Sequence, residues 1–272
     1  MRYSLKEILD LAEAGGFAVP AFNVYNLETL MGVARAAEET KSPIIIQMYS
    51  RLFNTGTGEF MAPVIMNVMN KLKTPVAFHL DHGAGIPECI RAMRFGTTGI
   101  MIDASTLPID QNIEITKKVV DMAKEAGVSV EGELGHIGST KDEKWDTYTE
   151  TADAVRYVNE TGIDALAIMV GTAHGKYAQA PVLAIDRISE IHSETKAHLV
   201  LHGGSGIENE YITRGIRAGI AKINVGTELR QPYERAMRER NDTEYAREQV
   251  YIRCRELIRD FLHTAGDAKI LG

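Results

Sequence analysis

The stretch VAFHLDHGA, residues 76–84, decides the fold and points to a site, because an apolar run ends here in three ionisable side chains. An apolar run of about four to eight residues predicts a buried strand. Ionisable groups inside a protein are costly unless they are paired or bind a metal. His79, Asp81 and His82 therefore indicate a functional site at the end of this strand. Because strand side chains alternate, His79 and Asp81 are expected on one side and His82 on the other.

Seven further apolar stretches have the same form. They are VPAFN from Val19, PIIIQMY from Pro43, GIMIDAS from Gly99, VSVEGELG from Val128, ALAIMVG from Ala165, HLVLHGGS from His198 and IAKINVGT from Ile220. Helix-like patterns such as NLETLMGVARAAEE and NEYITRGIRAG separate them. Eight strands with helical crossovers predict the α/β class and a (β/α)8 TIM barrel, and 272 residues suit the roughly 250 typical of that fold. An open doubly wound sheet is the alternative, weakened because no Gly-x-Gly-x-x-Gly motif follows the first strand.

The chain has no Pro-rich linker, low-complexity segment or short repeat, so a single domain over residues 1–272 is expected. Residues from about 230 to 272 lie outside the eight units and combine many arginines with a helical pattern. They predict a C-terminal helical extension that joins subunits into a homodimer or homotetramer.

Composition limits the class of partner. A formal net charge of -7 argues against nucleic acid or an anionic membrane as the main partner. No apolar run approaches the ~18 residues needed to span a bilayer, and the acidic N-terminal segment is unlike a signal peptide. Cys89 and Cys254 are too few for a disulfide framework. We therefore expect a cytoplasmic protein that acts on a small molecule.

Polar side chains lie at the carboxyl ends of the predicted strands, where barrel enzymes carry their active sites. These ends supply Asn23, Asp81, His82, Asp103, Glu131, Glu133, Gly171, His202, Asn224 and Thr227, with His174 just beyond the sixth strand. His82, His174 and His202 would then converge from three strands, which is the arrangement of a catalytic metal site with an open position. Zinc is the expected ion, and cobalt, iron and manganese remain alternatives.

Glycine-rich segments follow the last two predicted strands. Gly203, Gly204 and Ser205 offer backbone N–H groups beside His202, and residues 224–227 (NVGT) offer more. In a barrel the loops after strands seven and eight commonly bind phosphate, because N–H groups and a helix N-terminus attract an anion. These segments therefore predict a phosphate site next to the metal site.

Six motifs in order, HLDHG, MIDAS, EGELGHIG, GTAHGKY, LVLHGGSG and KINVGTEL, resemble those of the class II (metal-dependent) ketose-bisphosphate aldolases. The nearest members are the tagatose-bisphosphate and fructose-bisphosphate aldolases. The resemblance runs from Ala21 to Gly266. It implies a zinc-dependent lyase on a (β/α)8 barrel that reversibly cleaves a ketose 1-phosphate, such as fructose or tagatose 1,6-bisphosphate. The products would be dihydroxyacetone phosphate and an aldehyde.

The same resemblance implies roles for individual residues. The implied zinc ligands are His82, His174 and His202, and Asp103 and Glu133 match positions that hold a second metal or a displaced zinc in relatives. Asp81 would exchange a proton with the C4 oxygen, and Asn224 would lie near the enediolate. The implied substrate and phosphate contacts are Asn23, Ser50, Gly175, Lys176, Gly203, Gly204, Ser205, Asn224, Val225, Gly226 and Thr227. In relatives a monovalent cation often assists this end of the site.

Three departures from the family pattern bear on proton transfer and on the distal group. Relatives carry a Glu on the loop after strand five that exchanges the proton at the enediolate carbon, and the matching position here is Lys141. Its neighbours Asp142 and Glu143 are the candidates for that role. Gly226 stands where relatives more often have Ala or Asp. The C-terminal region is shorter than in the bisphosphate aldolases, and Arg247 is its match for the Arg that reaches into a second subunit's active site to bind a distal phosphate.

Arg51, in the segment YSRLF, leaves the distal group of the substrate open. It resembles the residue that faces the aldehyde half in the inositol-catabolic aldolases of this family, and a planar guanidinium binds phosphate, carboxylate or sulfonate. The first alternative is therefore a same-family aldolase for a deoxy-keto-sugar-acid phosphate, a sulfosugar phosphate or a longer ketose phosphate. The second is a non-catalytic subunit that supports another aldolase chain.

Overall fold

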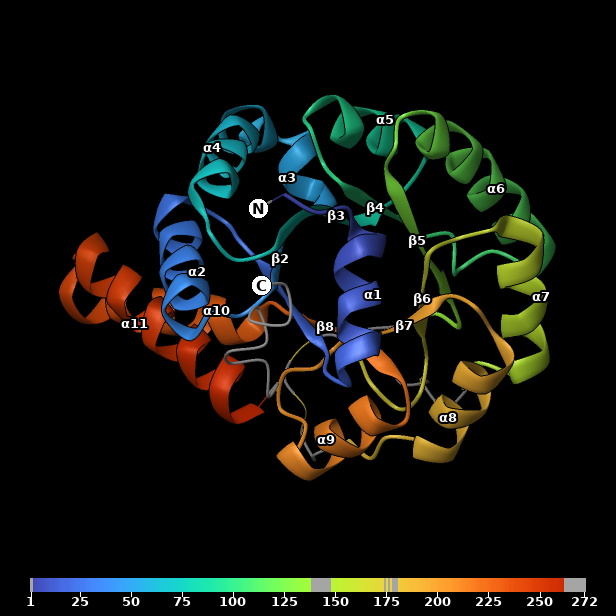
Figure 1. Ribbon diagram of the computed structural model, residues 1–272. Helices are drawn as coiled ribbons and strands as arrows, with labels where there is room; N and C mark the ends of the chain where they lie inside the picture. The colour runs from blue at the N-terminus through green and yellow to red at the C-terminus, as the bar shows by residue number, and fades with distance from the viewer. Residues whose placement is uncertain (1, 138–147, 174, 176, 178–180, 262–272) are drawn as a thin grey trace.

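A closed ring of eight parallel strands forms the centre of the molecule (Figure 1). The computed structural model describes residues 2–137, 148–173, 175, 177 and 181–261. The strands pair in chain order, and the last closes onto the first. They are β1 (Val19–Asn23), β2 (Ile44–Tyr49), β3 (Val76–Gly83), β4 (Gly99–Ile102), β5 (Ser129–Leu134), β6 (Ala165–Ile168), β7 (His198–Leu201) and β8 (Ile220–Val225). Each lies where the sequence predicts a strand, and the (β/α)8 barrel is confirmed.

Helices surround the strands and provide the crossovers (Figure 1). They are α1 (Leu5–Gly15), α2 (Leu27–Thr40), α3 (Ser50–Asn54), α4 (Thr57–Lys71), α5 (Ile86–Arg94), α6 (Ile109–Glu125), α7 (Thr151–Thr161), α8 (Ile185–Glu194), α9 (Asn209–Arg217), α10 (Thr227–Arg240), α11 (Thr243–Glu256) and the π-helical turn η1 (Leu257–Phe261). α3 and α4 fill the connection between β2 and β3, for which the sequence patterns above give no helix. Among the helices of the described residues, none has the length and apolar character that crossing a bilayer requires.

α1 lies across the end of the barrel at which the strands begin (Figure 1). Ser4 and Glu7 form a reciprocal cap at its N-terminus. Its buried residues are Leu5, Ile8, Leu9 and Ala12, which pack against the lower interior of the barrel. Burying one large aliphatic side chain is worth about 1.5–3 kcal/mol. α1 therefore closes the barrel floor with apolar side chains and leaves the polar strand ends at the opposite end.

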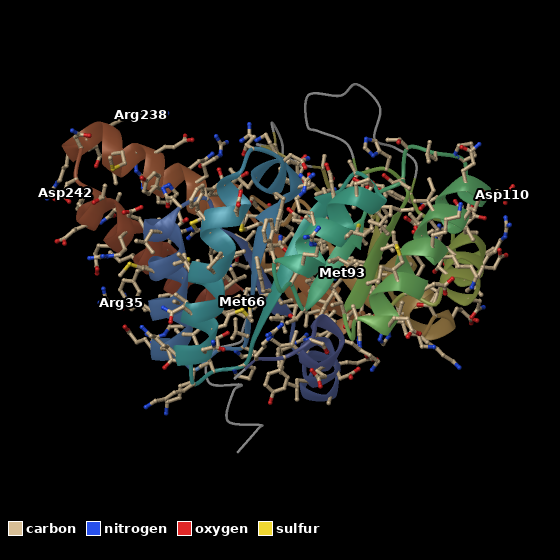
Figure 2. All side chains as sticks on the ribbon, turned by 90° about the horizontal axis from the view of Figure 1, so that it is seen from above. Arg35, Met66, Met93, Asp110, Arg238 and Asp242 are labelled. Carbon is tan, nitrogen blue, oxygen red and sulfur yellow. The ribbon has the colours of Figure 1, made fainter. Side chains whose placement is uncertain are left out.

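α10 and α11 form a helical hairpin that packs beside α2 (Figure 1). Asp242 accepts hydrogen bonds from the first backbone N–H groups of α11 and lies, like Arg238, at the outer end of the molecule (Figure 2). Gly32 of α2 allows a close approach, since a Cβ there would lie 2.9 Å from Val250 Cγ1. The predicted C-terminal extension is thus helical as far as it is described, and its first helix begins at Thr227.

Candidate active site

A cavity of about 610 Å³ opens at the carboxyl ends of the strands. Its walls combine carboxylate, imidazole, phenol, guanidinium and glycine groups. The described residues that line it are Asn23, Tyr25, Tyr49, Arg51, Leu52, Asp81, His82, Asp103, His136, Ile137, Gly175, Gly203, Ser205, Asn224, Gly226, Thr227 and Arg230. The barrel thus brings together predicted site residues that lie far apart in sequence, whereas the roles predicted for them remain predictions.

The end of β3 departs from regular strand geometry. His82 has a φ of 51°, in the left-handed region that residues other than glycine rarely adopt, and the β3–β4 register shifts between Leu80 and Gly83. As a result Asp81 and His82 face the same cavity, with Asp81 Oδ1 4.0 Å from His82 Nε2. The alternation expected from the sequence, with the two side chains on opposite sides, is wrong at this position. Backbone strain of this kind occurs where function requires a particular side-chain direction.

Two imidazoles meet beside Asp81. His82 Nε2 lies 3.1 Å from His202 Nδ1, and the two rings are nearly perpendicular. His82 Nδ1 lies 2.8 Å from Asp103 Oδ2, and His202 Nε2 lies 2.9 Å from Glu131 Oε1. Each imidazole therefore directs one nitrogen to a carboxylate and the other to its neighbour. A carboxylate that orients the outer nitrogen is typical of histidines that bind a metal.

The donor atoms of this cluster fit a divalent metal. Ligand atoms of Asp81, His82 and His202 lie within 4.8 Å of one another, and so do those of His82, Asp103 and Glu133. Glu133 Oε2 is buried and has no hydrogen-bond partner among the residues that the structure describes. Imidazole nitrogens with carboxylate oxygens suit zinc, cobalt, iron or manganese. The chain therefore has two overlapping candidate metal sites that share His82.

Two amides fix the carboxylate of Asp81. Asn23 Nδ2 donates to Asp81 Oδ2 at 2.7 Å, and Asn224 Nδ2 donates to Asp81 Oδ1 at 3.1 Å. Gln47 in turn donates to Asn23 Oδ1 at 2.7 Å, which fixes the orientation of that amide. Burial opposes the charge on Asp81, but the charges of His82, His202 and Lys222 and the hydrogen bond from Asn23 hold its pKa below the usual range. The carboxylate is therefore ionised and ready to accept a proton.

A buried charge pair lies behind His202. Lys222 Nζ donates to Glu131 Oε2 at 2.8 Å, and neither side chain is exposed. His79 Nε2 lies 3.5 Å from the same oxygen. Burial and the charge of Lys222 lower the pKa of His79 to about 3, so that this imidazole is neutral. β3, β5 and β8 thus each contribute one side chain to a polar cluster inside the barrel, beside His202 at the end of β7.

Comparison over the whole chain decides the family. The family model described as Fructose-bisphosphate aldolase class-II matches residues 3–267. The chain belongs to this family. Membership supports an aldolase, which is a carbon–carbon lyase, and the family is generally metal-dependent. The family resemblance of the six motifs is confirmed.

Solved structures of aldolases resemble the whole of this aldolase chain. The YdjI aldolase from Escherichia coli K12 is 34% identical with a TM-score of 0.91, and the match covers 98% of this chain and 100% of that one. A candidate fructose-1,6-bisphosphate aldolase from Coccidioides immitis is 25% identical with a TM-score of 0.91, covering 98% of each chain. The fructose-bisphosphate aldolase of Campylobacter jejuni is 21% identical with a TM-score of 0.80, covers 96% of this chain and 95% of its own, and shows the shared fold alone.

Charges in the cavity of this aldolase bear on metal binding. Burial favours the neutral imidazole of His82, but the charge of Asp81 and the hydrogen bond and charge of Asp103 outweigh it and raise its pKa to about 9. Burial and the charge of Asp103 raise the pKa of Glu133 to about 8. Without a metal, His82 and Glu133 therefore each hold a proton at neutral pH. A divalent ion competes with these protons, so metal affinity falls as the pH falls.

Some residues singled out from the sequence do not line the described cavity. Lys141, Asp142, Glu143, His174 and Lys176 lie outside the described residues. Ser50 is buried at the start of α3, and Gly204 and Val225 border a smaller cavity of about 130 Å³. Arg247 lies on α11, with its guanidinium 3.9 Å from the carboxylate of Glu244.

Sequence reasoning missed four polar side chains that line the cavity of the aldolase, namely Tyr25, Tyr49, His136 and Arg230. The ring centre of Tyr49 lies 5.8 Å from that of His82. His136 has its Nδ1 3.1 Å from Ser105 Oγ at the cavity wall. Tyr49 ends an apolar strand, and this position was the signal that could have found it. Lys222 carried a similar signal, a charge inside the apolar run IAKINV.

Proposed function

We propose that the protein is a zinc-dependent aldolase that reversibly cleaves a ketose 1-phosphate, such as fructose or tagatose 1,6-bisphosphate, to dihydroxyacetone phosphate and an aldehyde. The observation that carries this proposal is the position of Asp81, which two amides hold beside the imidazoles of His82 and His202. Cleavage of a carbon–carbon bond next to a ketone can use a proton acceptor together with a metal ion that stabilises the developing negative charge.

Zinc would be held by His82, His202 and, outside the described residues, His174. When bound, the ion supplies a Lewis acid that stabilises the negative charge left on the ketone half as the bond breaks. Asp103 and Glu131 orient the two described imidazoles through their outer nitrogens. A second metal at Asp103 and Glu133, and a monovalent cation near the phosphate, remain predictions.

Asp81 carries the proton transfer in this proposal. In the cleavage direction its carboxylate takes the proton of the C4 hydroxyl, while the electron pair of the C3–C4 bond moves toward the ketone. The aldehyde forms at C4, and the other fragment is left as the enediolate of dihydroxyacetone phosphate. A second proton transfer, to C3 of the enediolate, completes the reaction. Asp142 and Glu143 remain the candidates for it.

The C1 phosphate is assigned to the glycine-rich ends of β7 and β8. Gly203, Ser205, Gly226 and Thr227 line the cavity there. Thr227 begins α10, a helix of 14 residues, and helix N-termini attract anions. Gly203 has a φ of 68°, and a Cβ at this position would overlap the carbonyl oxygen of Ala173. Only glycine permits this loop conformation, which supports an anion-binding turn.

The distal end of the substrate supports a second candidate within the same family. Arg51 lines the cavity, and its guanidinium is suited to a carboxylate or sulfonate as well as to a phosphate. An aldolase for a deoxy-keto-sugar-acid phosphate, a sulfosugar phosphate or a longer ketose phosphate is therefore the alternative. A non-catalytic subunit gains no support, since the ordered groups around Asp81 have no structural purpose in a scaffold.

The proposed function is tested by cleavage of ketose 1-phosphates that end in phosphate, carboxylate, sulfonate or a neutral group, with released dihydroxyacetone phosphate as the readout. Each assay is run on zinc-loaded protein and again after a chelator has removed the metal. Release that stops on chelation and returns with zinc is expected. Equal release with and without metal would refute the mechanism, and the preferred distal group chooses between the two substrate classes.

Three further expectations extend this proposal. A single domain over residues 1–272, a cytoplasmic location and a homodimer or homotetramer built through the C-terminal helices remain predictions. Analytical ultracentrifugation of the full chain measures the oligomeric state directly, and a monomer at all concentrations would contradict the expected assembly.

A further inference from the structure

Tyr177 lies in the loop after β6, and its hydroxyl meets the loop after β7. The phenol oxygen Oη accepts a hydrogen bond from the backbone N–H of Ala173 at 2.7 Å. The hydroxyl proton faces two carbonyl oxygens, that of Ala173 at 2.8 Å and that of Gly203 at 2.9 Å. One side chain thus binds backbone groups of both loops and joins them.

The ring of Tyr177 contacts the other end of the same glycine-rich segment, residues 203–206 (GGSG). A Cβ placed on Gly206 would lie 3.4 Å from Tyr177 Cδ2, which is an ordinary van der Waals distance. Gly203 and Gly206, at the two ends of the segment, both have positive φ angles, 68° and 86°. Tyr177 therefore holds the first residue of the segment through its hydroxyl and packs on the last through its ring.

The segment 203–206 needs a constraint from outside, because all its residues except Ser205 are glycine. Glycine adopts many backbone conformations and loses more conformational freedom on ordering than any other residue. A loop that is ordered only when its ligand arrives binds more weakly than one that is ordered beforehand. The contacts of Tyr177 order this segment before any ligand binds.

The hydrogen bond to Gly203 also fixes the direction of a peptide plane. In a trans peptide the carbonyl oxygen and the next N–H point in opposite directions, and the described residues contain no cis peptide bond. Since Tyr177 holds the carbonyl oxygen of Gly203, the N–H of Gly204 is turned away from the phenol. Burial raises the pKa of Tyr177 to about 12, so its O–H stays protonated at neutral pH.

Tyr177 lies behind the segment and not in front of it. Gly203 and Ser205 line the large cavity, whereas Tyr177 is not among the described residues that do. Backbone N–H groups bind an anion well only when their directions are fixed in advance. The hydroxyl of Tyr177 can therefore act on a ligand in the cavity only through the segment that it holds.

We propose that Tyr177 is a positioning residue for the C1 phosphate, because its hydroxyl and ring hold residues 203–206 in the conformation that binds this anion. The inference rests on the proposed function, which assigns the segment to the phosphate, and adds to it a residue that no step above uses. Tyr177 contributes to the affinity for dihydroxyacetone phosphate. It acts neither on the aldehyde half nor on the bond that breaks.

Tyr177→Phe removes the hydroxyl and keeps the ring. The reaction is measured on zinc-loaded protein in the condensation direction, with dihydroxyacetone phosphate and glyceraldehyde 3-phosphate, or with the aldehyde that the wild type produces best. KM for dihydroxyacetone phosphate is expected to rise about tenfold, the usual effect of one lost hydrogen bond. KM for the aldehyde and kcat should change less than about twofold, since only binding of the phosphate is weakened.

Tyr251→Phe is the matched control. It removes a phenol hydroxyl that donates to Glu39 of α2, from a buried side chain outside the described cavity lining. Both KM values and kcat of this variant are expected to stay at the wild-type values. A rise in KM for dihydroxyacetone phosphate equal to that of Tyr177→Phe would overturn the inference, because any lost hydroxyl would then have the same effect.

A double-mutant cycle tests whether Tyr177 acts through the segment. Ser205→Ala is expected to raise KM for dihydroxyacetone phosphate several-fold in the wild type and less than about twofold in Tyr177→Phe, where the segment no longer places Ser205. Unchanged KM in Tyr177→Phe, or equal Ser205→Ala effects in both backgrounds, overturns the inference. Equal changes in both KM values and kcat also overturn it, since they indicate a general loosening of the site. A zinc-loaded wild type that does not bind dihydroxyacetone phosphate instead refutes the proposed function itself.

Discussion

Lys222 Nζ of β8 lies 2.8 Å from Glu131 Oε2 of β5, and neither side chain has any exposed surface. The other oxygen of Glu131 lies 2.9 Å from His202 Nε2. The ammonium group thus neutralises a carboxylate that lies against Nε2 of His202 and leaves Nδ1 of that ring directed to His82. A buried ion pair is weak evidence for stability by itself, so the orientation of His202 is the better reason for this one.

Lys222→Met should weaken both the fold and zinc binding. It leaves the charge of Glu131 buried without its partner, which typically destabilises a protein by about 3–5 kcal/mol. Loss of an orienting partner typically lowers metal affinity about 10- to 100-fold. Urea unfolding and chelator competition measure the two effects. The matched control is Lys222→Met with Glu131→Gln, which removes both charges and is expected to recover stability. Wild-type zinc affinity in Lys222→Met would contradict the orienting role.

Asp81→Ala should separate proton transfer from metal binding. The variant lacks the proton acceptor but keeps the imidazoles of His82 and His202, so zinc content and dihydroxyacetone phosphate affinity are expected to stay close to wild type. Cleavage should fall by about 10²- to 10⁴-fold, the usual contribution of general acid–base catalysis. Steady-state assays and metal analysis on the same preparation check this. Undiminished turnover would remove Asp81 from the mechanism.

Zinc affinity should rise with pH between 6 and 8. The pKa of His82 is raised to about 9 in the metal-free protein, so this proposed ligand holds a proton that the ion must displace. At least a tenfold gain in affinity per pH unit is expected for one displaced proton. Competition with a chelator of known protonation constants measures this affinity.

His202→Ala is expected to lose the metal, and stoichiometric zinc in that variant would argue against the ligand assignment.

His79 should make the metal-free protein less stable in acid. Its pKa is about 3 when folded and near 6.5 when unfolded, so between these values the unfolded chain binds a proton that the folded chain does not. Stability on this account is complete above pH 6.5 and is lost as the pH falls, by about 2 kcal/mol at pH 5. Urea unfolding of the wild type and His79→Gln should show a shallower acid slope in the variant. The partly exposed His192→Gln serves as the control, and a slope unchanged by His79→Gln would count against this account.

Arg51→Met should change substrate preference more than turnover. Loss of the guanidinium is expected to raise KM for ketose 1-phosphates with an anionic distal end by roughly tenfold or more. The KM for fructose 1-phosphate, whose distal end is neutral, should change little. An equal rise in KM for both kinds of substrate would mean that Arg51 maintains the structure of the site and does not recognise the distal group.

The sequence predicted the barrel well because each strand is a short apolar run whose end is marked by polar or glycine residues. That Asn23, Asp81, His202 and Asn224 lie together could be predicted from that position alone, since parallel strands place their carboxyl ends at one edge. Those patterns are local, and a local pattern is enough to predict a strand when one side of every strand faces a common core.

Features that depend on contacts between residues far apart in the sequence could not be predicted in the same way. Alternation along β3 put His82 on the wrong side, because the left-handed φ of 51° and the register shift arise only when β3 and β4 pair. The pairing of Lys222 with Glu131 depends on how β5 and β8 face each other across a closed barrel. Tyr25 was missed because a tyrosine in a loop has no distinctive pattern until the residues that line the cavity are known.

The closure of the barrel floor by α1 has an electrostatic consequence. Apolar side chains of the described residues seal one end, and the described cavity opens at the other. The local dielectric therefore falls from the mouth, past Asp81 and His202, toward Lys222 and Glu131, and charges interact more strongly where it is low. Charges far from the mouth, such as those of Lys222 and Glu131, therefore act on their neighbours over longer distances than charges at the mouth do.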